Sequence, residues 1–210
     1  MIRGGVRALD FLSRLAKYFA VTSLATSKMD EGEKNRYLSN HVSKESAKLI
    51  KSFGFEVKVF GLTEEMKTKN FLTVGNHMSY MDVFLLASVH PTLFVTSVDM
   101  GETPVLGQVT RQAGCIFVER RNRTTIEKDV MQMTQALKSG TNVTIYPEGT
   151  STDGLRILPF KKALLTAAIE AGVDILPVVL KYVEIDGEPF SRANHKKIAW
   201  YGDMGFAPHF

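Results

Sequence analysis

Cysteine is almost absent from this chain of 210 residues, which has only Cys115. A single thiol excludes a disulfide within the chain and is typical of a reducing compartment. Cys115 begins an apolar run with Ile116, Phe117 and Val118, so we expect a buried structural thiol and not a nucleophile. Histidine is also scarce, with five in the chain, and the His and Cys residues lack the spacing of metal ligands. We therefore predict no metal site.

Long apolar runs are also missing. No run approaches the roughly 18 residues of a membrane-spanning helix, and the N-terminus lacks the apolar core and cleavage site of a signal peptide. There is no internal repeat and no nucleic-acid-binding signature, so nucleic acid is not an expected partner. With 44% hydrophobic and 23% charged residues, the composition fits one globular domain with a sizeable core.

The net charge is mildly positive, because Lys plus Arg exceed Asp plus Glu by 26 − 22 = 4. The placement of the cations matters more than their excess. One cluster lies between positions 111 and 123, and a second consists of adjacent lysines: Arg111, Arg120, Arg121 and Arg123, then Lys161 and Lys162. Such clusters suit an anionic small ligand or an anionic membrane surface.

The first 50 residues are expected to be helical and to differ in character from the rest. Residues 1–26 place apolar side chains at helical spacing between basic ones, which is typical of a membrane-surface helix and equally of a helix packed on the domain. A charged break over 28–36 precedes a second helix over 37–52. We expect residues 1–50 to form amphipathic, membrane-interface helices and residues 51–210 to form the main domain.

From position 55 onward, predicted strands and helices alternate. The strand patterns cover 55–60, 71–75, 93–98, 115–118, 142–146, 175–180 and 197–201. The helical patterns cover 80–89, 104–113, 124–138 and 161–171, with Gly140 and Gly172 as stops. This alternation predicts an α/β fold with a mixed, mostly parallel sheet covered by helices, preceded by the N-terminal helical, membrane-associating segment.

The most informative stretch is residues 71–82, FLTVGNHMSYMD. A strand, a tight turn and a helix place His77 in the turn at the carboxyl edge of the sheet, where ligands of α/β folds bind. Residues five apart on a helix differ by about 140° in direction, so His77 and Asp82 can meet only if His77 precedes the helix. Ser79 as N-cap would start the helix at Tyr80. The pair is then a general base with its orienting acid, or a turn histidine and an ordinary helix-start acid.

Three further segments follow predicted strands: Glu119-Arg120-Arg121, the loop that begins Pro147-Glu148-Gly149-Thr150-Ser151 and continues to Lys161, and the apolar Leu176-Pro177-Val178. Each has a plain structural reading as solvated arginines, a turn or an edge strand. Taken together with His77, they would supply a base, cations for a phosphate, free N–H groups and an apolar wall. Acyl transfer onto an anionic alcohol needs these parts.

These four segments resemble the four motifs of the glycerolipid acyltransferases, the family of 1-acylglycerol-3-phosphate O-acyltransferases. NHMSYMD is similar to the family's Asn-His-x4-Asp motif, GCIFVERR to Gly-x-Ile-Phe-x-x-Arg, YPEGTS to Phe-Pro-Glu-Gly-Thr-Arg, and ILPVVL to the closing strand. They occur in the family's order between positions 75 and 180. The resemblance covers residues 1–50 and the last thirty only loosely.

The resemblance implies that His77 takes a proton from the free hydroxyl of a lysophospholipid while that oxygen attacks an acyl thioester, and that Asp82 holds the imidazole. It also implies a substrate-binding set of Asn76, Arg120, Arg121, Glu148, Gly149, Thr150, Ser151 and Lys161. The arginines, with Lys161 as a weaker candidate, would pair with phosphate. The product would be phosphatidic acid, and no cofactor is implied beyond acyl-CoA or acyl carrier protein (acyl-ACP) as co-substrate.

One position departs from the family pattern. Ser151 stands where the family usually has Arg, and a hydroxyl cannot form a forked pair with phosphate. Arg156, later in the same loop, is a candidate substitute. Alternatively, the acceptor lacks a phosphomonoester, as in relatives that act on lyso-ornithine lipid.

Two other classes of function stay open. A serine lipase would need Gly-x-Ser-x-Gly at a strand–helix elbow, which the sequence lacks, and a thioesterase would release fatty acid without an acceptor. A non-enzymatic lipid-binding module would explain residues 1–26 but not a His–Asp pair beside arginines. For the enzyme, we expect a peripheral or monotopic location on the cytoplasmic face of the inner membrane.

Overall fold

The computed structural model describes residues 2–119, 125–205 and 209, and of the side chains in the first helix those of 13 and 15–26. Its centre is a five-stranded sheet in the order β3-β2-β4-β1-β5, and every pairing in it is parallel. The strands are β1 (Leu72–Gly75), β2 (Leu93–Ser97), β3 (Ile116–Val118), β4 (Val143–Ile145) and β5 (Ile175–Val178). The predicted α/β class with a mostly parallel sheet is confirmed.

The strand order positions the site. Strand β1 lies between β4 and β5, with Thr73 opposite Thr144 on one side and Leu176 on the other. Strands β1 and β4 are buried along their whole length, which is why they read as short apolar runs and not as alternating ones. Since all three strands run the same way, the loops that leave β1, β4 and β5 meet at one edge of the sheet.

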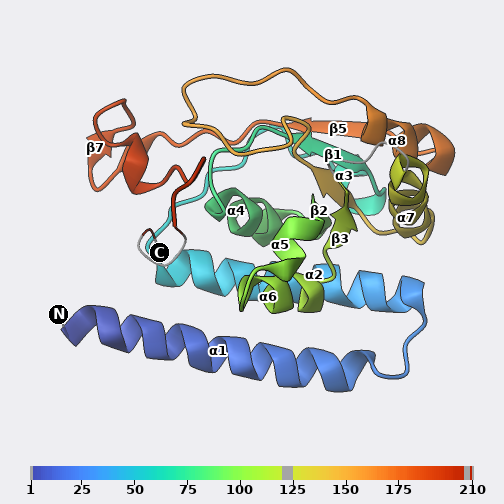
Figure 1. Ribbon diagram of the computed structural model, residues 1–210, viewed down its shortest axis with the longest axis horizontal. Coiled ribbons are helices and arrows are strands. Elements are labelled where there is room, and N and C mark those ends of the chain that lie inside the picture. The colour runs from blue at the N-terminus through green and yellow to red at the C-terminus, as the bar shows by residue number, and fades with distance from the viewer. Residues whose placement is uncertain (1, 120–124, 206–208, 210) are drawn as a thin grey trace.

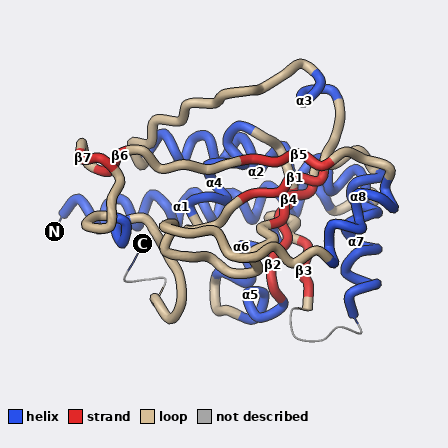
Figure 2. The backbone as a smooth tube through the Cα atoms, turned by 90° about the horizontal axis from the view of Figure 1, so that it is seen from above, coloured by secondary structure: helices blue, strands red, loops and turns tan. Residues whose placement is uncertain are grey.

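Helices flank this sheet (Figures 1 and 2). Helix α2 packs against α4, and α7 packs against α8 on the side of the strands away from α4. The α-helices are α1 (Ile2–Thr26), α2 (Glu31–Ser52), α3 (Glu65–Thr68), α4 (Met81–Val89), α5 (Val98–Glu102), α6 (Leu106–Gln112), α7 (Ile126–Lys138) and α8 (Thr166–Ala171). Short 3-10 turns, η2 (Ala163–Leu165) and η3 (His195–Lys197), complete the helical elements described here.

Helix α2 starts six residues earlier than its sequence pattern predicts. A capping box explains the difference: the Asp30 carboxylate accepts from the Glu33 backbone N–H at 2.8 Å, and the Glu33 carboxylate accepts from the Asp30 N–H at 3.2 Å. This exchange satisfies two N–H groups that a helix start leaves unpaired. The charged stretch predicted as a break is therefore mostly the first turns of α2. Further on, Leu38 and Ile50 are buried in the core.

Helix α1 lies along α2 (Figure 1) and contacts it and α6. The Tyr18 hydroxyl donates to the Gln112 carbonyl at 3.0 Å, and Thr22 is fully buried. This side of α1 packs on the domain, while Leu24 is 78% exposed. The expected helix is confirmed, and its membrane contact stays a prediction. Within the described residues, no helix combines the length and the apolar character that crossing a bilayer requires.

Helix α7 has the amphipathic pattern that the sequence predicts. Val130, Met133 and Leu137 are buried against the sheet, and Met131 on the opposite side is 51% exposed. Gly140 follows the helix with a φ of 84°, a left-handed conformation that glycine adopts without steric cost. Its predicted role as the stop is confirmed.

Two predicted strands are absent. Residues 55–60 form an irregular, exposed segment in which Phe60 is 88% exposed; their alternation of apolar and polar residues finds no strand to pair with. Residues 197–201 contain the end of η3 and an irregular stretch. The chain between β5 and η3 instead forms a small antiparallel hairpin of β6 (Glu184–Ile185) and β7 (Glu188–Pro189).

Candidate active site

His77 and Asp82 form a bonded pair at the edge of the sheet. The imidazole Nδ1 lies 2.8 Å from the Asp82 Oδ2. The His77 side chain is 19% exposed, and the Asp82 side chain is fully buried. Since the carboxylate can only accept, Nδ1 carries the hydrogen and Nε2 is the basic nitrogen available to a substrate. The sequence-based hypothesis of an oriented imidazole therefore has the geometry it requires.

Backbone donors fix the Asp82 carboxylate further. Its Oδ2 also accepts from the N–H groups of Met78 and Ser79, at 2.7 and 2.9 Å. Helix α4 begins at Met81, one residue later than predicted, and Ser79 serves it by accepting from the Met81 N–H at 3.2 Å. Asp82 folds back over the turn because its Oδ2 accepts from backbone N–H groups of the turn that precedes the helix.

Two tyrosines that the sequence reasoning missed complete the pair's surroundings. The Tyr182 hydroxyl donates to Asp82 Oδ1 at 2.6 Å. The Tyr146 ring stacks on the His77 ring, with 4.1 Å between centroids and 7° between planes. Burial, together with the nearby Asp82 charge, raises the pKa of both phenols above the usual value of 10.0. Tyr146 stands at the aromatic position of the YPEGTS segment, which was a usable signal, whereas Tyr182 had none.

Glu148 ties two loops together. It is 3% exposed, and its two carboxylate oxygens accept from the backbone N–H groups of His77, at 2.9 Å, and Leu158, at 2.8 Å. The His77 carbonyl in turn accepts from the Thr152 N–H at 3.0 Å. The loop after β4 is therefore held directly against the turn that carries the imidazole.

Asn76 performs a similar task toward β5. Its side-chain Nδ2 donates to the Leu180 carbonyl at 2.9 Å, and its Oδ1 accepts from the Leu180 N–H at 2.8 Å. The amide side chain thus pairs with the chain beyond β5 as a neighbouring strand would. The predicted substrate-binding residue Asn76 lies in the site, with its amide bonded to this backbone.

The remaining predicted loop residues surround the same edge. Gly149 has a φ of 75°, and the Lys161 side chain lies across its Cα, where a Cβ would come within 2.6 Å of Nζ. Thr150 is exposed and donates to the Ser151 carbonyl at 3.4 Å. Lys161 is exposed as well, and its backbone N–H donates to the Pro147 carbonyl at 2.8 Å. A cation therefore borders the glycine turn.

The predicted arginines have different positions. Arg120 and Arg121, with Arg123 of the same cluster, lie outside the described residues. The Arg111 guanidinium donates to the Gly101 carbonyl at 3.1 Å and lies 5.0 Å from the centre of the Phe117 ring, so it holds α5, α6 and β3 together. Arg156 is exposed, and its carbonyl accepts from the Thr152 hydroxyl at 3.3 Å.

Two residue types that often carry chemistry, a thiol and clusters of metal ligands, contribute little to the described part of this site. Burial raises the pKa of the Cys115 thiol to about 12, which keeps it protonated and unreactive near neutral pH. In the part of the chain that the structure describes, no group of three His, Cys, Asp or Glu side chains is placed to hold a metal ion.

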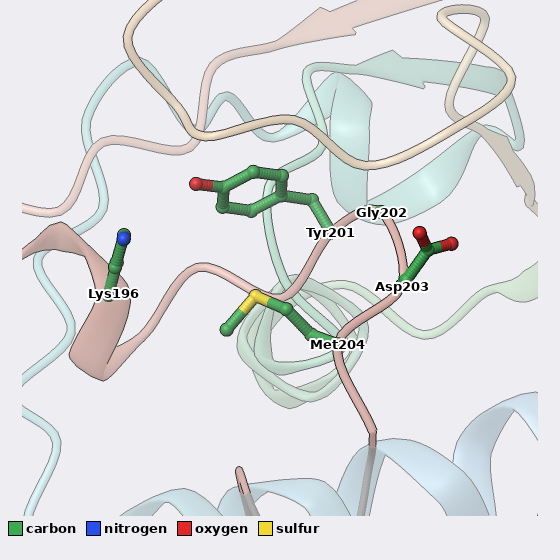
Figure 3. A pocket seen from close by; sticks show the side chains of 5 residues that line it. All are labelled: Lys196, Tyr201, Gly202, Asp203 and Met204. Atoms are coloured by element: carbon green, nitrogen blue, oxygen red, sulfur yellow. The ribbon is translucent and has the colours of Figure 1, made fainter.

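An open hollow of about 360 Å³ lies in the C-terminal segment, lined by Lys196, Tyr201, Gly202, Asp203 and Met204 (Figure 3). None of these residues belongs to the four predicted motifs. The segment reaches the site through Trp200, whose backbone N–H donates to the Met78 carbonyl at 2.8 Å. It helps to hold the turn that carries His77.

The comparisons with known proteins agree with this geometry. The family model described as Acyltransferase matches residues 56–181. A 1-acyl-sn-glycerol-3-phosphate acyltransferase from Neisseria gonorrhoeae is 35% identical over 134 residues, 64% of this chain and 50% of the relative. A lyso-ornithine lipid O-acyltransferase from Rhizobium meliloti is 33% identical over 181 residues, 83% of this chain and 60% of the relative.

Among solved structures, the crystal structure of the 1-acyl-sn-glycerophosphate (LPA) acyltransferase PlsC from Thermotoga maritima is similar, with a TM-score of 0.61 and 25% identity. The similarity covers 84% of this chain and 73% of that one. The match spans only 50% and 60% of the length of the two sequence relatives named above. The family match covers more than half of the chain and includes His77, Asp82 and Glu148. The chain belongs to the acyltransferase family.

Proposed function

We propose that the chain transfers a fatty acyl group from an acyl thioester to the free hydroxyl of a lysolipid. One observation carries the proposal: the His77 Nδ1 bonds the buried Asp82 carboxylate at 2.8 Å, so Nε2 is the basic nitrogen at a sheet edge where substrates of α/β folds bind. An oriented imidazole of this kind typically contributes about 10²- to 10⁴-fold to the rate of proton transfer.

In the proposed reaction, His77 Nε2 removes the hydroxyl proton as the alcohol oxygen attacks the thioester carbonyl carbon. Asp82 stabilises the imidazolium that forms. The tetrahedral intermediate then expels the thiolate, which takes the proton back from Nε2, so the ester and a free thiol leave and the imidazole is regenerated. No covalent acyl-enzyme is needed, because the thioester already supplies an activated acyl group.

The acceptor would be held by the loops around this base. Arg120 and Arg121 would pair with a phosphate, and Lys161, which lies across Gly149, would add a third cation. Gly149, Thr150 and Ser151 would border the glycerol portion. Glu148 would act by keeping this loop against His77, since both its oxygens accept from backbone N–H groups.

The first candidate acceptor is 1-acylglycerol-3-phosphate, which would make the product phosphatidic acid. The relative from Neisseria gonorrhoeae carries a name of that kind. Lyso-ornithine lipid is the second candidate. It is favoured by Ser151 in place of the family's arginine, and by relatives with that name that align over 83% and 87% of the chain. The donor would be acyl-CoA or acyl-ACP, and the enzyme would work at the cytoplasmic face of the inner membrane.

A matrix of donors and acceptors tests the proposal. The purified chain, in liposomes, is given acyl-CoA or acyl-ACP with 1-acylglycerol-3-phosphate, with lyso-ornithine lipid or with no acceptor, and products are measured by mass spectrometry. We expect an acceptor-dependent ester that the His77→Ala variant does not make. Free fatty acid without an acceptor would indicate a thioesterase, and no thioester turnover with any pair would indicate a lipid-binding module.

A further inference from the structure

The Asp82 carboxylate has a second buried oxygen that no part of the His77 turn satisfies. Oδ2 accepts from His77, Met78 and Ser79, while Oδ1 accepts from the Tyr182 hydroxyl at 2.6 Å. The Asp82 side chain has no exposed surface. A buried carboxylate oxygen that loses its donor incurs the full cost of desolvation, so the Tyr182 hydroxyl is the donor that satisfies Oδ1 in this buried position.

Tyr182 reaches Asp82 because the chain beyond β5 is held in register. The two bonds between the Asn76 amide and the Leu180 backbone, at 2.8 and 2.9 Å, fix a point two residues before the tyrosine. On the other side, the Tyr182 ring stacks with Phe190 at 6.4 Å, and the Phe190 N–H donates to the Val183 carbonyl at 2.8 Å. The phenol is therefore placed by backbone pairing on one side and by ring packing on the other.

We propose that Tyr182 is a positioning residue of the acyl transfer, acting through Asp82, and that Asn76 serves it by holding Leu180. The inference rests on the proposed function. Tyr182 touches neither the acyl thioester nor the acceptor. By donating to Oδ1 it fixes the orientation of the carboxylate and leaves Oδ2 aimed at the His77 Nδ1–H.

The expected consequence is a change in the proton affinity of the pair. Three further groups lie near the His77–Asp82 pair. They are the Tyr80 and Tyr146 phenols, which interact with Tyr182, and the Glu148 carboxylate, which accepts from the His77 N–H. The hydroxyl that donates to Asp82 Oδ1 is that of Tyr182. Removing the Tyr182 hydroxyl should make the pair bind its proton more tightly. The acidic limb of kcat/KM should then move to higher pH.

The test compares Tyr182→Phe with Tyr18→Phe. Both variants lose one hydroxyl that donates a hydrogen bond, to Asp82 in the first and to the Gln112 carbonyl on α6 in the second. We expect Tyr182→Phe to lower kcat by about 10- to 100-fold, to keep both KM values within about twofold and to shift the acidic limb upward, while Tyr18→Phe changes none of these. A wild-type kcat and acidic limb in Tyr182→Phe, or the same losses in both variants, would overturn the proposal.

A second variant tests the proposal even if Tyr182→Phe does not fold. Replacement of Tyr182 by 2,3-difluorotyrosine keeps the ring and the hydroxyl but makes the hydroxyl a stronger donor. It should move the acidic limb to lower pH, and a shift upward or no shift would contradict the assignment.

A third measurement is independent of turnover. The NMR resonance of the His77 Nδ1–H, which donates to Asp82, should shift in Tyr182→Phe relative to the wild type, and an unchanged resonance would overturn the assignment. If the wild type transfers acyl groups to no acceptor while this resonance shifts as expected, the proposed function fails and the effect of Tyr182 on the His77–Asp82 pair remains.

Discussion

At the scale of single residues, the site is a buried acid with four donors. Asp82 accepts from one imidazole, two backbone N–H groups and one phenol. The imidazole that it orients is partly exposed, as a base that meets a substrate must be. Asp82 therefore orients the imidazole, and the exposed part of His77 leaves that imidazole accessible.

Removal of the imidazole should separate activity from stability. We expect His77→Ala to lower acyl transfer by about 10²- to 10⁴-fold without unfolding the chain, because the lost ring is at the surface of the site. Activity is measured with whichever acceptor the donor and acceptor matrix identifies, and stability by thermal unfolding. His41→Ala is the control, since His41 stacks between Tyr18 and Tyr37, away from the site. Near-wild-type activity in His77→Ala would remove the base assignment.

The thiol should be protected in the native protein. Cys115 is partly buried and burial raises the pKa of its thiol to about 12, so it should be a thiolate far less often at pH 8 than a free thiol is. We expect iodoacetamide to alkylate it rapidly only after denaturation, as followed by intact mass. Equal rates in native and denatured protein would mean that the thiol is accessible.

Residue-level reasoning from the sequence found His77 and Asp82 because they are close along the chain and their geometry follows from one turn. It could not find Tyr182, which lies 100 residues from Asp82 in a segment with no motif. It assigned Asn76 and Glu148 to the substrate-binding residues, which stays a prediction, and did not foresee that their polar atoms bond the backbone of Leu180, His77 and Leu158. Those backbone partners can be identified only when the order of the strands in the sheet is known.

At the scale of elements, buried strands and amphipathic helices were predictable from the order of apolar residues. A buried strand reads as a short apolar run, and a helix packed on one side has apolar residues at helical spacing. The pattern of α7 gave its buried side correctly. The alternation of apolar and polar residues over 55–60 predicted a strand that the structure does not have. Alternation is a property of one segment, whereas a β-strand also needs a neighbouring strand to pair with. The start of α2 was placed too late, since the capping box of Asp30 and Glu33 lies in a stretch without apolar residues.

Helix α7 provides a matched pair of methionines. Met133 has no exposed surface and packs on the sheet, whereas Met131 is 51% exposed. We expect Met133→Ala to lower the free energy of unfolding by about 2–5 kcal/mol, and Met131→Ala to change it by less than about 0.5 kcal/mol. Urea denaturation of both variants measures the difference. Equal effects would show that α7 does not bury the side assigned to it.

At the scale of the whole molecule, stability should be limited at both ends of the pH range. Burial lowers the pKa of His90 from 6.5, so the stability that its neutral form provides is present above that value and is lost as pH falls. Burial raises the pKa of Cys115 from 9.0 to about 12, and those of Tyr146 and Tyr182 from 10.0. Their contribution is complete below pH 9 and is lost as pH rises, because the unfolded chain ionises first.

We therefore expect the free energy of unfolding to be highest between about pH 6.5 and 9 and to fall on both sides. Urea denaturation at intervals from pH 5 to 11 measures this curve. In Cys115→Ala the decline above pH 9 should be shallower than in the wild type, because one of the ionising groups is gone. A free energy that stays constant from pH 8 to 11 would contradict the burial of these groups.

The bond from Asn76 to Leu180 and that from Tyr182 to Asp82 each close a loop of about a hundred residues. The proposed acyl transfer would therefore depend on contacts that form only when distant parts of the chain have docked, whereas the helices can form locally and early. During refolding, far-ultraviolet circular dichroism should recover before acyl transfer does. The recovery of acyl transfer would then report when the last stage of folding is complete.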